Sequence, residues 1–183
     1  FETVWKRQNT SFTSCNLTTC RRQWSTDMRV IETSETATTI DLSESETIFI
    51  KEILSAYPLV PNESRELTRS ADTSDLEEDT ELLRTSLADL TRGHQKKLQA
   101  WVNAPETFRE VENRYLFRIT NDNRDWFLQI LNDLRIGSWQ QLDCPSQEEL
   151  QELTASQEVI RPLWTMELAG LLQSFLLNSP GNR

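Results

Sequence analysis

The apolar residues of this chain recur mainly at the spacing of an α-helix. In five stretches, apolar positions lie about three or four residues apart, so that they fall on one face of a helix. These stretches cover residues 49–57, 76–101, 108–119, 126–134 and 158–177. The last one is apolar on most sides, which is typical of a helix buried by its neighbours. The pattern therefore predicts a mainly α-helical bundle of about five or six helices.

Local signals indicate where these helices begin and end. Three S-x-x-E sequences, which begin at Ser43, Ser74 and Ser146, predict capping boxes. In such a box the serine hydroxyl and the glutamate carboxylate each accept a hydrogen bond from the other residue's backbone amide. Glycine favours helix ends, so we expect a break in the second helix near Gly93 and the end of the fourth at Gly137. The box at Ser146 adds a short helix before the last one.

Residues 29–42 show the period of a β-strand instead. An apolar pair is followed by a polar segment at 33–36, after which Ile40 and Leu42 alternate with polar neighbours. This pattern predicts a small N-terminal β-hairpin packed on the helices. We expect the shared core to contain Phe49, Ile53, Leu87, Phe108, Trp126, Ile130, Leu134, Trp164, Leu168 and Phe175.

The first 27 residues differ in composition from the rest of the chain. They are rich in Ser, Thr, Asn and Gln, show no helical or strand period, and carry four basic residues against two acidic ones. Met28 directly precedes the strand pattern. We therefore expect a single mainly helical domain over residues 28–178, with residues 1–27 as a disordered or non-native extension and 179–183 as a tail. The alternative for residues 1–27 is a basic arm that contacts an acidic partner.

The composition describes an acidic domain with few groups suited to catalysis. The 183 residues suit one domain, and 29 acidic against 19 basic residues give a net charge of -10. A single histidine, His94, excludes sites that need two. Three cysteines complete neither a disulfide framework nor a zinc pattern, which fits a reducing cytoplasm. No apolar run typical of a signal peptide is visible, so we expect a cytoplasmic protein that contacts no membrane.

Three groups of reactive residues have simpler structural explanations. His94 lies in the basic cluster 92–97, which we interpret as a solvated helix face because the sequence indicates no orienting partner for a catalytic base. The acidic run 75–81 lies where a helix start stabilises negative charge, although paired carboxylates can also bind metals. Cys144 has no histidine nearby in the sequence. We therefore predict no catalytic, cofactor-binding or metal-binding residues.

The most informative segment runs from Trp126 to Trp139. Its apolar residues occupy one helical face, and Asp133 and Arg135 flank that face on opposite sides while Asn132 points further away. Charges at the edge of a buried face usually pair with neighbouring helices, which is the structural interpretation. The functional interpretation is a partner-binding or ligand site framed by Asp133, Arg135 and Trp139. We therefore single out Trp126, Asn132, Asp133, Arg135 and Trp139 as an interaction or structural motif.

This segment resembles the signature of a known family. Trp126, followed by Leu-Asn-Asp-Leu-Arg at 131–135 and then Ile-Gly-Ser-Trp, is similar to the tryptophan and L-N-D-L-R signature of a bacterial family catalogued only as a domain of unknown function. The resemblance covers residues 28–177, including the strand-then-helix opening and the closing apolar helix, and is looser over residues 60–110. It implies no defined activity. Some members of the family are labelled transcriptional regulators. The genes of others often lie beside the gene of a proteolysis adaptor, which implies a loose link to regulated proteolysis.

These observations predict a non-enzymatic protein-interaction or regulatory module. Its partner is expected to be another protein, with a homodimer as a further option, and it needs no cofactor. The alternative is a nucleic-acid-linked transcriptional regulator that uses the 92–97 cluster and the N-terminal segment, although a net charge of -10 repels phosphates. A third interpretation is an enzyme that uses carboxylates alone.

Overall fold

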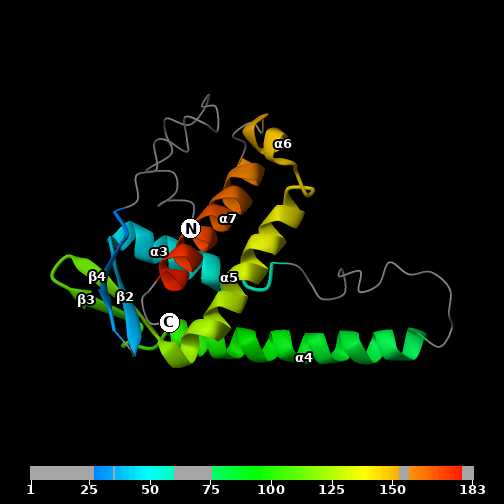
Figure 1. Ribbon diagram of the computed structural model, residues 1–183, viewed down its shortest axis with the longest axis horizontal. Coiled ribbons are helices and arrows are strands. Elements are labelled where there is room, and N and C mark those ends of the chain that lie inside the picture. The colour runs from blue at the N-terminus through cyan, green and yellow to red at the C-terminus, as the bar shows by residue number, and fades with distance from the viewer. Residues whose placement is uncertain (1–26, 35, 60–75, 153–156, 179–183) are drawn as a thin grey trace.

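The computed structural model describes residues 27–34, 36–59, 76–152 and 157–178 (Figure 1). The elements follow one another as β1 (Arg29–Thr33), β2 (Ala37–Leu42), α3 (Glu44–Ser55), α4 (Leu76–Val102), β3 (Phe108–Val111), β4 (Arg114–Thr120), α5 (Asn121–Gln141), α6 (Gln147–Glu152) and α7 (Gln157–Leu177). The strands gather at one end of the molecule, and α5 and α7 run side by side (Figure 1). Residues 1–26 of the predicted extension over 1–27, and the tail at 179–183, lie outside the described residues.

The four strands form one antiparallel sheet in the order β1-β2-β4-β3. The first two strands make the predicted N-terminal hairpin, and β4 pairs with the other side of β2, with Ile40 opposite Phe117. The described chain is therefore mainly helical, as predicted, but its β part is a four-stranded sheet and not a hairpin alone.

The predicted helix over residues 108–119 is wrong, because this segment forms the β3–β4 hairpin. Its apolar positions satisfy two periods at once: Phe108, Val111, Tyr115 and Ile119 have helical spacing, whereas Tyr115, Phe117 and Ile119 alternate as in a strand. The alternation prevails because it places Phe117 and Ile119 in the core, where both are at most 1% exposed. Aromatic and β-branched side chains of this kind pack well on a pleated surface.

The core lies where the sheet meets the helices, and aromatic rings form its centre. The ring of Phe117 stacks on Phe108 of the neighbouring strand, with 4.4 Å between the centroids. It also meets Phe127 of α5 edge-on at 5.9 Å, and Phe127 lies 4.9 Å from the ring of Trp101 at the end of α4. Such tilted and stacked pairs add to the stabilisation from burial alone. This cluster joins the sheet to two helices.

Most of the predicted core residues lie in or against this core. Five are buried, namely Ile53, Phe108, Ile130, Leu134 and Leu168, and three pack against the core while partly buried, namely Phe49, Trp126 and Phe175. Leu87 and Trp164 are the exceptions, since both are half-buried and lie outside the core cluster.

The pair formed by α5 and α7 supplies the largest helical contact. Leu168, Leu172 and Leu176 of α7 are buried. At the start of α5 the buried Arg124 donates a hydrogen bond to the backbone carbonyl of Leu176, near the end of α7. A cation at this position satisfies a carbonyl that the helix leaves free and complements its dipole. Within the described residues, every helix falls short of the length and apolar character that crossing a membrane requires.

Helix α4 differs from its prediction in two ways. It continues unbroken through Gly93, where a Cβ would meet nothing within 4 Å. Its predicted apolar face is also only partly buried, because the N-terminal end of α4 reaches beyond the other described elements (Figure 1). Leu98 is buried, whereas Leu83 and Leu90 are 47% and 55% exposed. Only the C-terminal part of α4 therefore belongs to the folded body.

Two of the three predicted capping boxes form at the helix starts that the structure describes. Ser43 and Glu46 form the predicted capping box of α3, and Ser146 and Glu149 exchange the same pair of hydrogen bonds at α6. The hydrogen bond from the backbone of Ser146 lowers the pKa of the Glu149 carboxyl. The predicted box at Ser74 lies outside the described residues. The predicted stop at Gly137 is wrong, because α5 continues to Gln141 and buries this glycine.

The β3–β4 turn places its first residue in a backbone conformation that favours glycine. Glu112 has a φ of 56°, a left-handed conformation that costs a residue with a Cβ about 1–2 kcal/mol. Turns of this kind usually carry glycine here. We expect Glu112→Gly to raise the free energy of unfolding by about 1 kcal/mol in urea denaturation, once the added freedom of the unfolded chain is subtracted. Asn113→Gly is the matched control and should lower it, and equal effects of the two substitutions would contradict this account.

Candidate functional site

All five residues singled out from the sequence lie on α5. The first, Trp126, faces α4 and not the solvent. Its ring meets Trp101 edge-on with 5.7 Å between centroids, and the amine of Lys97 lies 4.1 Å above its centre. His94 approaches the same ring at 6.3 Å. Trp126 therefore belongs to the contact between α4 and α5. Its ring also contacts Lys97 and His94, two residues of the basic 92–97 cluster.

Asp133 and Arg135 contact two different neighbours of α5. The hydroxyl of Tyr57, just after α3, donates to Oδ2 of Asp133 at 3.2 Å. On the other side, Nη1 of Arg135 donates to Oε1 of Gln173 on α7 at 2.8 Å. The two charges thus flank the buried face as the sequence predicts, and these contacts match the structural interpretation of both residues.

Trp139 organises the turn that leaves α5. Its indole Nε1 donates to the backbone carbonyl of Pro145 at 3.0 Å, and its own carbonyl accepts from the amide of Cys144 at 3.0 Å. Asp143 and Cys144 in this turn have positive φ values of 60° and 55°. The hydrogen bond fixes the orientation of the indole while 40% of the residue stays exposed.

One exposed face of α5 carries the remaining features of the motif. Asn132, Ile136 and Trp139 are spaced four and three residues apart, so they share a face of the helix. Ile136 is 45% exposed, and the exposed Arg135 lies beside it. We call Asn132, Arg135, Ile136 and Trp139 the α5 face. Sequence reasoning missed Ile136, although its spacing from Trp139 could have indicated it.

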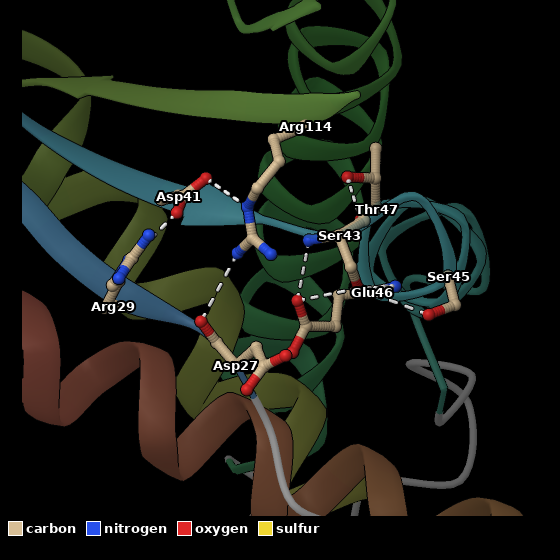
Figure 2. Close-up of polar contacts among 8 residues, drawn as sticks. All are labelled: Asp27, Arg29, Asp41, Ser43, Ser45, Glu46, Thr47 and Arg114. Atoms are coloured by element: carbon tan, nitrogen blue, oxygen red, sulfur yellow. Dashed lines mark hydrogen bonds and ion pairs between the residues drawn. The ribbon is translucent and has the colours of Figure 1, made fainter. Parts of the chain in front are cut away.

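An ion-pair cluster around a buried carboxylate of the sheet was not foreseen from the sequence. Asp41 of β2 is only 5% exposed, and its two carboxylate oxygens each accept from a different arginine (Figure 2). Nε of Arg29 on β1 lies 3.0 Å from Oδ2, and Nε of Arg114 on β4 lies 2.7 Å from Oδ1. Arg114 also donates to the backbone carbonyl of Asp27 at 3.4 Å. The cluster connects three adjacent strands.

Strand register explains why these residues meet. Arg29 lies directly opposite Asp41 across β1–β2. Leu116 lies opposite Asp41 across β2–β4, which places Arg114 two residues away on the same face. Since the sequence pattern predicted a helix over 108–119, it could not bring Arg114 to the sheet. The S-x-x-E box of α3 lies beside this cluster (Figure 2).

The two arginines keep the carboxylate of Asp41 in its charged form. Burial by itself raises the pKa of Asp41, but the hydrogen bonds and charges of Arg114 and Arg29 outweigh it and hold that pKa below its ordinary value. The hydrogen bond to Asp41 in turn raises the pKa of Arg114. A carboxylate with a lowered pKa and both oxygens occupied is poorly suited to accept a proton near neutral pH. We therefore interpret the cluster as a structural clamp.

The other reactive groups do not converge on one site. Arg92 pairs with Asp89 one helical turn away at 2.8 Å. Cys144 is exposed in the turn after α5. Among the residues the structure describes, no three His, Cys, Asp or Glu side chains come close enough together to hold a metal ion. The α5 face is thus the part of the predicted motif that remains accessible.

Comparison of the chain with protein-family models, with curated proteins and with solved structures finds no match. The resemblance to the family with the L-N-D-L-R signature therefore remains a prediction.

The two arginines of the clamp offer a matched pair of substitutions. The Arg114 side chain is 33% exposed, and that of Arg29 is 71% exposed. We expect Arg114→Met to lower the free energy of unfolding by about 2–3 kcal/mol, because it leaves one oxygen of a buried carboxylate unpaired. Arg29→Met should cost less than about 1 kcal/mol. Urea denaturation followed by circular dichroism measures both values. Equal losses would show that the clamp does not depend on burial.

The clamp also predicts how stability depends on pH. The folded-state pKa of Asp41 is lowered, so its stabilising contribution is present above its unfolded pKa and is lost as the pH falls through the folded value. We expect the stability difference between the wild type and Asp41→Asn to be constant above about pH 5 and to shrink below about pH 4. Denaturant titrations across this range measure it. A difference that stays constant down to pH 3 would contradict the role of the charged carboxylate.

Proposed function

We propose that this chain is a non-enzymatic protein-interaction or regulatory module of the cytoplasm, and that its partner protein binds the α5 face. The observation that carries the proposal is the exposure of two large apolar side chains side by side on a well-anchored helix. Ile136 is 45% and Trp139 40% exposed, although α5 is held by the core along its other face.

The chemistry of the α5 face suits a protein partner. Tryptophan and arginine are enriched among the residues that dominate binding energy in protein interfaces. The indole of Trp139 is already oriented by its hydrogen bond to Pro145, which reduces the entropy that binding would cost. Arg135 gives one hydrogen bond to Gln173 and retains further N–H donors for a carboxylate at the rim of the partner. The expected partner surface is therefore an apolar pocket with an acidic edge.

The alternative of a nucleic-acid-linked regulator draws less support from the geometry. It depends on the basic cluster 92–97, where Arg92 pairs with Asp89 and Lys97 lies over Trp126. Two of the cluster's cations are therefore engaged within the protein, and phosphate binding depends on the number of free cations.

Two equally exposed isoleucines provide the test of this proposal. Ile136 on α5 is 45% exposed and Ile48 on α3 is 44% exposed. We expect Ile136→Asp to reduce capture of a specific partner from nuclease-treated lysate at least about tenfold, while Ile48→Asp leaves it unchanged. Quantitative mass spectrometry measures capture, and thermal melting checks that both variants fold.

Asp133→Ala separates the structural part of the motif from the binding part. It removes the acceptor of the Tyr57 hydroxyl, so it should lower the melting temperature without changing capture. If Ile136→Asp and Trp139→Ala both leave the amount of captured partner unchanged, the proposal is overturned. Capture that requires intact nucleic acid would favour the alternative instead.

A further inference from the structure

One side of the sheet gathers positive charge. A row of directly opposed residues crosses it from β3 to β1, in the order Arg109, Leu116, Asp41 and Arg29. Directly opposed side chains share one face of a sheet. We call this side the outer face, because the aromatic core lies on the other. Arg114 and Arg118 are two residues from Leu116 in either direction along β4, so strand alternation places both on the outer face as well. Four arginines thus share this face in a chain whose net charge is -10.

Two of the four arginines are not used by the fold. Arg109 and Arg118 are exposed, and neither side chain makes an ion pair or a hydrogen bond within the described part of the chain. The other two hold the carboxylate of Asp41 (Figure 2). Glu32 of β1 lies opposite Thr39, which in turn lies opposite Arg118, so this carboxylate is two strands away, at about 10 Å. The guanidinium groups of Arg109 and Arg118 are therefore available to an anion from another molecule.

The spacing of this arginine pair fits an extended polypeptide. Arg109 lies directly opposite Leu116, and Arg118 lies two residues further along β4, so the two arginines are diagonal neighbours. Diagonal neighbours in an antiparallel pair are about 7–8 Å apart. An extended chain rises about 3.3 Å per residue, so its alternate side chains lie about 6.6 Å apart and point to the same side. Side chains one turn apart on a helix are closer, at about 5–6 Å.

The chemistry of the outer face favours carboxylates over nucleic acid. Guanidinium groups pair with carboxylates and phosphates through two parallel hydrogen bonds. Sheets that bind single-stranded nucleic acids also present aromatic rings on which bases stack. Within β3 and β4, the aromatic residues Phe108, Tyr115 and Phe117 all lie on the core side. The half-buried Leu116 lies between the two arginines instead.

We propose that Arg109 and Arg118 bind an extended segment of another protein that carries carboxylates at alternate residues. Each guanidinium pairs with one carboxylate, and the residue between the two carboxylates points away from the sheet. The backbone of the segment passes over Leu116. The net negative charge of the chain repels anions at long range, so recognition depends on these short-range contacts. The outer face includes no residue of the α5 face, so this surface is separate from the one in the proposed function.

Amide NMR spectra of the full chain, titrated with a synthetic peptide of repeated Glu-Ser, test the arginine pair. We expect the signals of Arg109, Leu116 and Arg118 to shift, and a peptide of repeated Gln-Ser to leave them unchanged. Arg109→Gln combined with Arg118→Gln should raise the dissociation constant at least about fivefold, because both ion pairs are lost. The matched control is Arg84→Gln combined with Arg92→Gln, which removes the same charge from α4 and should change the constant less than about twofold.

A second peptide tests the spacing. Repeated Glu-Glu-Ser-Ser has the same composition and charge as repeated Glu-Ser, but no two of its carboxylates lie two residues apart. We expect it to bind at least about threefold more weakly. Equal affinity for the two peptides would overturn the extended arrangement.

Other occupants of the outer face give different results. If the Glu-Ser peptide shifts only signals elsewhere in the chain, or if the folded Arg109 and Arg118 double variant binds it as tightly as the wild type, the proposal is overturned. Thermal melting checks that both double variants fold. Oligothymidylate that shifts the same signals at lower concentrations than the peptide would identify a nucleic acid as the occupant instead. Shifts caused by raising the protein concentration alone would identify a second copy of the chain.

Discussion

Burial of β2 on both faces forces the carboxylate of Asp41 to find counter-charges inside the sheet. All six residues of this strand are buried, since it lies between β1 and β4 and its apolar face packs on the aromatic core. A lone charge at this position would destabilise the fold by more than a surface ion pair could offset. Arg29 and Arg114 resolve this conflict, one from each neighbouring strand. The strand order and the ion pairs are thus two aspects of one constraint.

Local chemistry was predictable from the sequence wherever it involved residues close together in the chain. The capping boxes at Ser43 and Ser146 depend on four consecutive residues, and both form. The identity of the segment 108–119 depended instead on a pairing with β2, more than sixty residues earlier, which no local period reveals. A helix over residues 108–119 does not place Arg114 beside β2, so the sequence pattern could not predict its ion pair with Asp41. The helical spacing of Phe108, Val111, Tyr115 and Ile119 was a coincidence of two overlapping patterns.

The residues of the candidate motif on α5 fall into two groups according to the direction in which their side chains point. Its inward and sideways members anchor α5 to α4, α3 and α7, through Trp126, Asp133 and Arg135. Its outward members are Asn132 and Trp139, joined by Ile136. The sequence indicated that the charges flank the apolar stripe, but only the fold shows which neighbours they meet. A single short motif thus serves packing on one side and leaves a surface open on the other.

Helix α4 has a core at one end and none at the other, so its stability is graded along its length. Leu98 and Trp101 hold its C-terminal part in the core, and opening its backbone hydrogen bonds there requires unfolding of the whole body. Towards its N-terminus the leucines Leu83 and Leu90 are exposed, so amide hydrogens would exchange progressively faster from Leu90 to Leu83. Any protein that covers this segment would therefore order the backbone as well as bury side chains. Affinity for this segment and its helicity become one coupled quantity.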